Sequence, residues 1–160
     1  MTDNEFTERL TQMRETMYRV SCTQLHDPGD RDDAVQEALL KAWHNRHKLR
    51  EERYMKTWVV RILINECHNI QRKKKREKPL ADVVEKADFA ESDSDIELRD
   101  ALFRLNDKLR LPVVLHYIEG YRVKEIAKIL GIPKGTVLWR MSKARTELGL
   151  MMNPEDGDNT

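Results

Sequence analysis

The chain has few of the residues that mark secreted, membrane or disulfide-rich proteins. Of its 160 residues, only 2 are Cys, 6 are Gly and 5 are Pro. Cys22 and Cys67 form no C-x-x-C pair, so each is expected to be a buried thiol in a reducing compartment. The sequence has no run of 18 apolar residues that would predict a membrane span, and residues 1–19 lack the apolar core of a signal peptide. We therefore expect a cytoplasmic chain with no membrane insertion.

The sequence also lacks the motifs of an enzyme active site. His44 and His47 lie three residues apart and Cys67 adjoins His68, but no third ligand stands at a recognised metal spacing. There is no Gly-rich phosphate loop and no nucleophile motif. We predict no catalytic residues, no metal site and no cofactor, and an enzyme is the less favoured alternative.

Charged residues are abundant and unevenly distributed. They form 36% of the chain, against 39% hydrophobic residues, as in soluble helical proteins. The formal net charge is +1, yet residues 41–78 hold 13 Lys and Arg against 4 acids, residues 79–100 hold 2 against 8, and residues 101–150 hold 10 against 4. Because phosphate contacts dominate nucleic-acid affinity, the two basic blocks suggest two places that hold one nucleic acid. Solvated helix faces are the alternative for each block.

Two amphipathic patterns begin before the first basic block. Apolar residues at steps of four, three, four and three predict a helix over residues 4–25. These residues are Phe6, Leu10, Met13, Met17 and Val20. The sequence DPGD at 27–30 predicts a turn.

The second pattern predicts a helix over residues 32–47. Its inward residues are Val35, Leu39, Ala42 and Trp43, and its outward line is Asp33, Glu37, Leu40 and His44. A protein-docking strip and a solvated face with one leucine both fit this outward line.

A loop over residues 48–54 leads to a long helix predicted over residues 55–75. Its inward residues are Val59, Ile62, Leu63, Cys67 and Ile70. The outward residues combine charge with hydrogen-bonding groups suited to phosphates and base edges: Arg61, Asn65, His68 and Arg72. Glu66 falls near the apolar face, where a buried ion pair or a frayed boundary would explain it. The helix ends in RKKKR at 72–76, a run suited to a phosphate backbone.

Taken together, these patterns predict an all-α protein of two small helical domains. Residues 1–78 form the first domain, residues 79–95 a flexible acidic linker, residues 96–150 the second domain and residues 151–160 a disordered tail. The second domain opens with the apolar residues Ile96, Leu98, Leu102 and Leu105. We expect its next helix to follow Pro112.

Residues 121–148 have the pattern of a helix-turn-helix. Ile126, Ala127 and Leu130 share one face of a first helix over 123–130, and Gly131 supplies its C-terminal glycine. In a second helix from 133, the residues at steps of four, three and four face inward: Val137, Met141, Ala144 and Leu148. The opposite face carries Lys134, Trp139, Ser142, Lys143 and Thr146. In this motif the second helix enters the DNA major groove, although an ordinary helical hairpin has the same pattern.

Two stretches carry a resemblance to a known family. DAVQEALLKAW at 33–43 with TWVVRILINECHNIQRKKKR at 57–76 resembles the second conserved region of bacterial sigma factors of the extracytoplasmic-function (ECF) group, and LPVVLHYIEGYRVKEIAKILGIPKGTVLWRMSKAR at 111–145 resembles their fourth. The resemblance covers residues 17–148. It implies a dissociable, non-catalytic subunit of RNA polymerase that reads the minus-10 and minus-35 promoter elements.

The resemblance also implies partners and site residues. The partners are core RNA polymerase, through the coiled coil of its largest subunit and its flap, then promoter DNA, and an anti-sigma factor. Docking on the polymerase would use Asp33, Gln36, Glu37, Leu40 and Lys41. The minus-10 element would be read, with one base flipped into the loop, by Lys48, Arg50, Arg53, Tyr54, Lys56, Arg61, Asn65, His68 and Arg72. The minus-35 element would be bound by Lys134, Thr136, Leu138, Trp139, Arg140, Ser142, Lys143 and Arg145.

Three positions depart from the family pattern. Leu138 and Trp139 stand where relatives usually have a basic or small polar residue, and apolar side chains contact thymine methyls but offer little to guanine. The exposed Trp139 could equally contact a protein. Arg122 stands where a capping Ser or Thr is common, a loss of about 1 kcal/mol that would leave Glu125 without a capping-box partner.

An autonomous helix-turn-helix regulator is the alternative from another class. It would bind duplex DNA without polymerase, which explains residues 121–148 but gives no role to the outward strip of 32–47 or to the first basic block.

Overall fold

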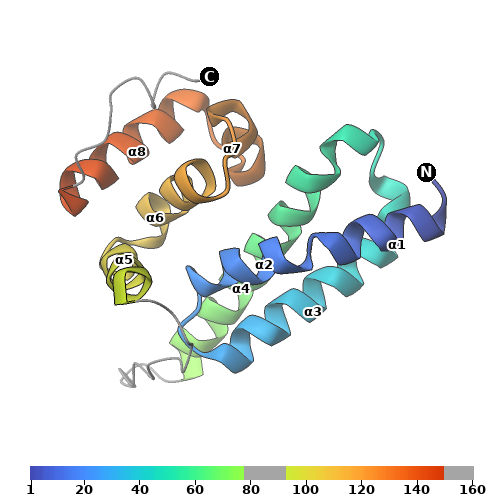
Figure 1. Ribbon diagram of the computed structural model, residues 1–160, viewed down its shortest axis with the longest axis horizontal. Helices are drawn as coiled ribbons and strands as arrows, with labels where there is room; N and C mark the ends of the chain where they lie inside the picture. Colours follow the sequence, from blue (N-terminus) through green and yellow to red (C-terminus); the bar gives the residue numbers. More distant parts are fainter. Residues whose placement is uncertain (78–92, 150–160) are drawn as a thin grey trace. The chain divides into compact units, whose positions relative to one another are not determined.

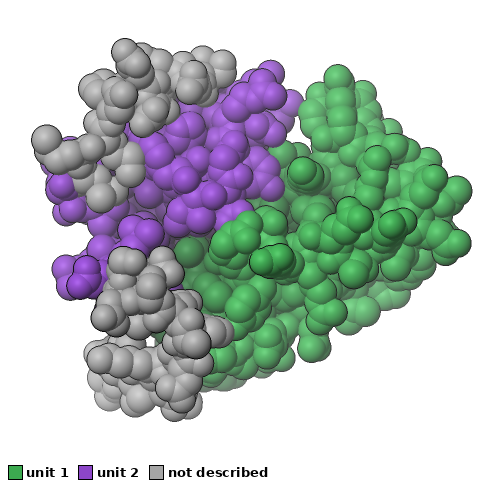
Figure 2. Space-filling model, in the orientation of Figure 1, with its two compact units in different colours: residues 1–88 green, residues 89–160 purple. Residues whose placement is uncertain are grey.

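The computed structural model describes residues 1–77 and 93–149. The chain divides into two compact units, Met1–Asp88 and Phe89–Thr160 (Figures 1 and 2). Every regular element in the described residues is helical, which confirms the predicted all-α fold of two helical parts. The predicted tail, and the predicted linker up to residue 92, lie outside the described residues, and residues 93–95 belong to a helix rather than to the linker.

In residues 1–77, unit 1 has four α-helices and two short 3₁₀ turns. The helices are α1 (Asp3–Gln12), α2 (Arg14–Cys22), α3 (Pro28–His44) and α4 (Met55–Glu77), and the turns η1 (Arg46–Lys48) and η2 (Glu52–Tyr54) lie between α3 and α4. α2, α3 and α4 pack on one another (Figure 1). The core between these helices includes eight residues with no exposed surface: Met17, Val20, Ala38, Ala42, Val59, Val60, Leu63 and Cys67.

Local chemistry sets where these helices begin. At α1, Glu5 N–H donates to Thr2 Oγ1 at 3.1 Å and Thr2 N–H donates to Glu5 Oε2 at 2.9 Å, a complete capping box. At α3, Asp27 Oδ1 accepts a hydrogen bond from Gly29 N–H at 2.9 Å and Pro28 occupies the first turn.

Several predicted element bounds in unit 1 differ from the structure, and the helix expected over 32–47 is α3, Pro28–His44. The helix expected over 4–25 is two helices separated at Met13, and the turn expected at 27–30 is the start of α3. Met13 is itself buried, so the apolar spacing continues across the break and does not reveal it. The loop expected over 48–54 contains part of η1 and all of η2. In α4, the fully or nearly fully buried Val60 and Ile64 join the predicted inward face, whereas Ile62 and Ile70 are half-buried.

The described part of unit 2, residues 93–149, has four α-helices and a π-helical turn. These are α5 (Asp93–Phe103), α6 (Asp107–Val113), the turn η3 (Val114–Ile118), α7 (Val123–Leu130) and α8 (Lys134–Leu148). α8 packs on α6 and on α7. One cluster of its core consists of Leu102, Leu105, Leu109, Val113, Val114 and Ala144, with Tyr117 and Leu148 packed against it.

The helix-turn-helix is present, with corrections to its surroundings. Gly131 ends α7 in the left-handed conformation (φ 68°, ψ 36°), as predicted. The buried face of α7 is Val123, Ile126 and Ile129, so the predicted inward positions of Ala127 and Leu130 are wrong by one residue. Pro112 lies inside α6 instead of preceding a helix, because Asn106 Oδ1 caps Leu109 N–H at 3.1 Å and starts the helix earlier.

Candidate functional site

The outward face of α3 carries the strip predicted from the sequence. The predicted outward residues Asp33, Glu37, Leu40 and His44 are all exposed, as is Gln36, and Leu40 retains 55% of its surface. Leu40 lies in the C-terminal part of the 17-residue helix α3, about one turn after Glu37. A leucine with this exposure has no packing role inside unit 1. Asp33, Gln36, Glu37 and Leu40 form one accessible surface, which we call the α3 strip.

Lys41 lies at the edge of this surface, and its side chain is bound to α4. Its Nζ forms an ion pair with Glu66 Oε1 of α4. Glu66 is only 7% exposed, so the buried ion pair is the correct one of the two explanations that its sequence position allowed. The hydrogen bond to Glu66 raises the pKa of Lys41 above the usual lysine value. The Lys41 ammonium therefore joins α3 to α4.

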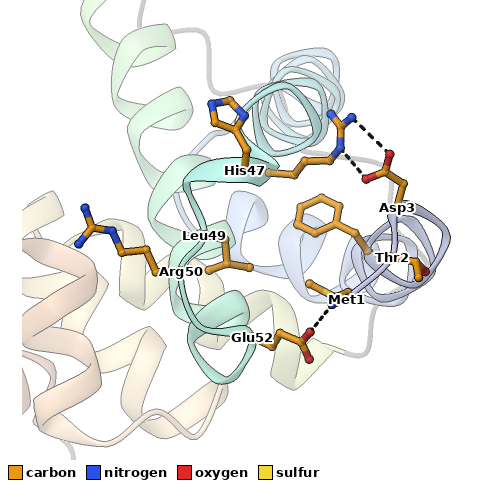
Figure 3. Close-up of a pocket in the computed structure, with 9 residues that line it drawn as sticks. Met1, Thr2, Asp3, His47, Leu49, Arg50 and Glu52 are labelled. Atoms are coloured by element: carbon orange, nitrogen blue, oxygen red, sulfur yellow. Dashed lines mark hydrogen bonds and ion pairs between the residues drawn. The ribbon is translucent and has the colours of Figure 1, made fainter.

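The connection between α3 and α4 borders a pocket. It has a volume of about 420 Å³ (Figure 3). The N-terminus, α1 and the connection supply its lining, which consists of Met1, Thr2, Asp3, Phe6, Arg46, His47, Leu49, Arg50 and Glu52. The Met1 amino group lies 2.8 Å from Glu52 Oε1, and Arg9 Nη1 lies 3.9 Å from Glu52 Oε2. The pocket mixes cationic, acidic, aromatic and aliphatic groups, and its two acids, Asp3 and Glu52, are paired with Arg46 and with the Met1 amino group.

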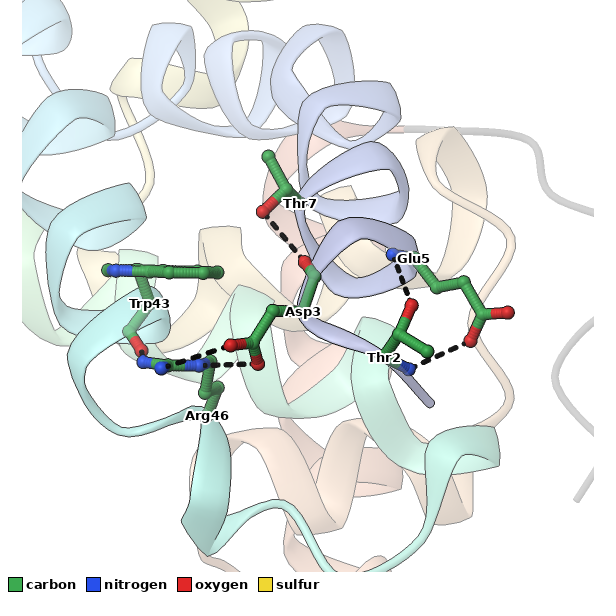
Figure 4. A network of polar contacts seen from close by, with 6 residues as sticks. All are labelled: Thr2, Asp3, Glu5, Thr7, Trp43 and Arg46. Carbon is green, nitrogen blue, oxygen red and sulfur yellow. Dashed lines mark hydrogen bonds and ion pairs between the residues drawn. The ribbon is translucent and has the colours of Figure 1, made fainter.

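The start of this connection is fastened to α1. Arg46 Nε donates to Asp3 Oδ1 at 3.0 Å and Arg46 Nη2 donates to Asp3 Oδ2 at 3.4 Å (Figure 4). Arg46 also lies over the Trp43 ring, 3.9 Å from its centroid, and Nη1 donates to the Trp43 carbonyl oxygen at 2.9 Å. The Phe6 ring is 6.2 Å from Trp43 and 6.3 Å from Trp58. Sequence reasoning missed Arg46, because the predicted helix extended to residue 47 and placed it on a helix face.

The residues predicted for the minus-10 element lie on the connection and along one side of α4. Those with exposed side chains are Lys48, Arg50, Arg53, Tyr54, Lys56, Arg61, Asn65 and Arg72, and His68 is half-buried. Arg53 Nε bonds Glu51 Oε2 at 2.8 Å and stacks 4.7 Å from the Tyr54 ring, and Arg72 bonds Asn69. The structure brings these cations together on one unit.

The basic end of α4 is held to the beginning of α3. Lys74 Nζ lies 2.5 Å from Asp30 Oδ2 and 3.4 Å from Asp27 Oδ2. The hydrogen bond to Gly29 is the main reason that the pKa of Asp27 is lowered, and Lys74 adds to the effect. One lysine of the RKKKR run is thus engaged within the protein.

The outward face of α8 is accessible as predicted. Lys134, Leu138, Trp139, Ser142 and Lys143 are exposed, whereas Thr136, Arg140 and Arg145 are half-buried. Arg145 Nη1 donates to Tyr117 Oη at 3.1 Å, so this cation is partly engaged inside unit 2. Lys143 Nζ lies 5.1 Å from the Trp139 ring centroid.

The start of α7 corrects one expectation. Glu125 Oε1 accepts a hydrogen bond from Arg122 N–H at 3.0 Å and lies 3.6 Å from Arg122 Nε. Glu125 therefore makes its half of the capping box, although residue 122 has no side-chain hydroxyl to accept a hydrogen bond from the Glu125 N–H. The prediction that Glu125 has no partner is wrong.

Within residues 1–77 and 93–149, no three His, Cys, Asp or Glu residues are grouped as metal ligands. Cys22 and Cys67 are not joined in a disulfide. None of the helices in the part of the chain that the structure describes has the length and apolar character needed to cross a membrane.

Comparison with family models defines the class of the two units. The model for Sigma-70 region 2 matches residues 7–77, and the model for Sigma-70, region 4 matches residues 95–148. The first match covers the α3 strip and the connection, and the second covers the helix-turn-helix.

Relatives that match both units narrow the class to a family. The chain is 31% identical to the ECF RNA polymerase sigma-E factor of Escherichia coli K12 over 144 residues, 79% of this chain and 75% of the relative. It is 34% identical to the ECF RNA polymerase sigma factor SigM of Mycobacterium tuberculosis H37Rv over 126 residues, 77% of this chain, and spans only 64% of the length of that relative. The chain belongs to the ECF family of RNA polymerase sigma factors, which confirms the resemblance seen in the sequence.

A solved structure agrees with this assignment. The sigma factor RpoE of Bartonella quintana, in complex with the anti-sigma factor NepR, matches with a TM-score of 0.77 and 25% identity, covering 90% of this chain and 94% of that chain. CnrH, in complex with the cytosolic domain of CnrY, shares the fold with a TM-score of 0.69 and 22% identity over 92% of this chain and 87% of that chain.

Proposed function

We propose that the protein is an alternative sigma factor that binds core RNA polymerase and directs transcription initiation at its own promoters. The observation that carries this proposal is the pairing of two surfaces on unit 1. The α3 strip supplies an exposed acidic and apolar face, and α4 with its preceding connection supplies a cationic one. A regulator acting on duplex DNA alone needs only the helix-turn-helix of unit 2, so the α3 strip favours the sigma factor.

We assign core polymerase binding to Asp33, Gln36, Glu37 and Leu40, with Lys41 at the border holding α3 on α4. The coiled coil of the largest subunit faces this strip, and the flap faces unit 2. Two acids beside an exposed leucine suit a partner with a basic surface around an apolar pocket.

We assign minus-10 reading to the connection and α4. A base flipped out of the nontemplate strand enters the pocket bordered by His47, Leu49 and Arg50, while Arg61, Asn65, His68 and Arg72 follow the strand along α4. Unstacking a base costs a few kcal/mol, and stacking and charge in this pocket offset that cost. Minus-35 binding falls to α8, with Lys134, Thr136, Arg140 and Arg145 near phosphates.

In this function the protein has no catalysis of its own and acts in the cytoplasm, where polymerase is. We also propose an anti-sigma factor as a partner, since RpoE of B. quintana, which resembles this chain over most of both lengths, was solved with one. An anti-sigma factor covering the α3 strip would prevent polymerase binding.

The test is transcription in vitro with purified core polymerase and a fragmented genomic library. The native chain should direct new start sites that share two elements. Asp33→Lys with Glu37→Lys should abolish core binding in a pull-down, while Glu8→Lys with Glu15→Lys, two exposed acids on α1 and α2, should not. Initiation that does not change when the chain is added would overturn the proposal, and tight site-specific binding by the chain alone would favour the autonomous regulator.

A further inference from the structure

The base-facing side of α8 presents two apolar side chains. Leu138 is 37% exposed and Trp139 is 61% exposed, the largest exposed fraction among the large hydrophobic residues of the described chain. Both lie within the first two turns of α8, the part of a recognition helix that meets base edges. The inward residues Val137, Met141 and Ala144 have no exposed surface, so neither Leu138 nor Trp139 serves the core of unit 2.

The same face offers little to guanine. Guanine is read by an arginine or lysine that reaches O6 and N7 with two hydrogen bonds. Arg145 is half-buried with Nη1 on Tyr117 Oη, and Arg140 is half-buried. Lys134 and Lys143 are exposed, but Lys134 is the first residue of α8 and is assigned above to a phosphate, and the Lys143 ammonium lies 5.1 Å from the Trp139 ring centroid. The side chains of α8 placed to contact bases are therefore mainly the apolar Leu138 and Trp139.

The charge around this pair favours DNA over a protein as the occupant. α8 contains Lys134, Arg140, Lys143 and Arg145 against the single acid Glu147. Exposed Ser142 and Thr146 continue the same face with hydroxyl groups. Cations that surround an apolar centre match a groove floor of bases between two phosphate backbones.

We infer that Leu138 and Trp139 read thymine C5-methyl groups in the minus-35 element. This inference rests on the proposed function and specifies which base feature α8 recognises. In the major groove, thymine is the only base that presents a methyl group, so apolar contact distinguishes T·A pairs from the others. Burial of one methyl corresponds to about a fourfold change in affinity.

The experiment removes methyl groups without changing base pairing. Each thymine of the minus-35 element, on both strands, is replaced singly by deoxyuridine, and promoter binding by the polymerase holoenzyme with the full chain is measured. At least one replacement should weaken binding by about fourfold. The variant Leu138→Ala/Trp139→Ala should bind the unmodified promoter more weakly and lose its sensitivity to deoxyuridine.

The matched control is Leu98→Ala, which removes another exposed leucine of unit 2 from α5, where Leu98 is 44% exposed. It should keep the deoxyuridine response of the native chain. Thermal unfolding of all variants checks that unit 2 is intact.

Four results would overturn the inference. These are a minus-35 element without A·T pairs, no effect of deoxyuridine at any position, an equal effect in the native chain and the double variant, or a double variant that loses core binding instead of promoter binding. The last result would assign Leu138 and Trp139 to a protein contact. If the native chain still forms a holoenzyme that initiates normally, each of these results leaves the proposed function intact. If the native chain does not initiate transcription at all, the proposed function itself is wrong.

Discussion

Lys41 of α3 and Glu66 of α4 form an ion pair between two helices that are 25 residues apart in sequence at this point. The two ends differ in environment, since the Glu66 side chain is 9% exposed and the Lys41 side chain 45%. The pair therefore satisfies a buried carboxylate from the edge of unit 1. Because α3 carries the α3 strip and α4 carries cations proposed for the minus-10 element, this pair holds the two surfaces in register.

Lys41→Ala should lower the free energy of unfolding of unit 1 by about 1–3 kcal/mol, because it leaves the Glu66 carboxylate buried without its partner. Lys41→Met with Glu66→Leu, which replaces both partners by apolar groups, should recover most of the loss. Urea unfolding of the three proteins measures this. A single variant as stable as the native chain would show that the pair contributes nothing.

The same pair predicts a pH dependence. Glu66 raises the pKa of Lys41, so the folded state binds this proton more tightly than the unfolded state does. Its contribution is complete below the ordinary lysine pKa and is lost as the pH rises through the raised value. The double apolar variant should lack this alkaline loss, which unfolding measured from pH 8 to 11 would detect.

Periodicity predicted which faces of α3 and α8 are exposed, because both are long, regular helices with one apolar side. Asp33, Glu37 and Leu40 on α3, and Trp139 and Lys143 on α8, lie where the 3.6-residue repeat puts them. The family resemblance then gave these faces a function. The assignment of individual residues to polymerase or DNA stays a prediction.

Contacts between distant residues could not be predicted in this way. The role of Glu66 depends on Lys41 in another helix, and the engagement of Arg145 depends on Tyr117, 28 residues earlier. The break at Met13 also left no signal, because this residue is buried at the junction of α1 and α2 and continues the apolar repeat. Repeats report burial along one helix and carry no information on its partners.

Asp27→Ala should destabilise unit 1 by about 1 kcal/mol, because Asp27 caps α3 through Gly29 N–H. Asp27→Asn keeps an acceptor for that N–H and should cost less. The lowered pKa of Asp27 means that its contribution is present above the ordinary carboxyl value of 3.8 and is lost as the pH falls through the lowered folded value. Chemical unfolding at pH 7, 4 and 3 should show this acid loss in the native chain, and equal acid sensitivity in the Asn variant would contradict it.

Asp3→Ala should loosen the connection between α3 and α4 with little effect on global stability. Asp3 is 68% exposed, and an exposed pair contributes about 0.2–1 kcal/mol. Arg46→Lys should act in the same way, since lysine cannot reproduce the two bonds to Asp3 with the stack on Trp43. We expect faster amide exchange over residues 46–54 and slower promoter opening in both variants. Glu8→Ala, an exposed acid on the same helix, is the control, and unchanged exchange in both variants would exclude α1 as the support of the connection.

Gly135 and Gly120 of unit 2 provide a matched pair for a final prediction. A Cβ at either position would meet no atom within 4 Å, but Gly120 has φ +79° whereas Gly135 lies in the first turn of α8. Gly135→Ala should stabilise unit 2 by about 0.5–1 kcal/mol, because alanine loses less backbone entropy in a helix. Gly120→Ala should destabilise it by about 1–2 kcal/mol, because a Cβ is strained in the left-handed region. Thermal unfolding compares them, and a loss of stability in both would mean that space, not backbone conformation, decides the outcome.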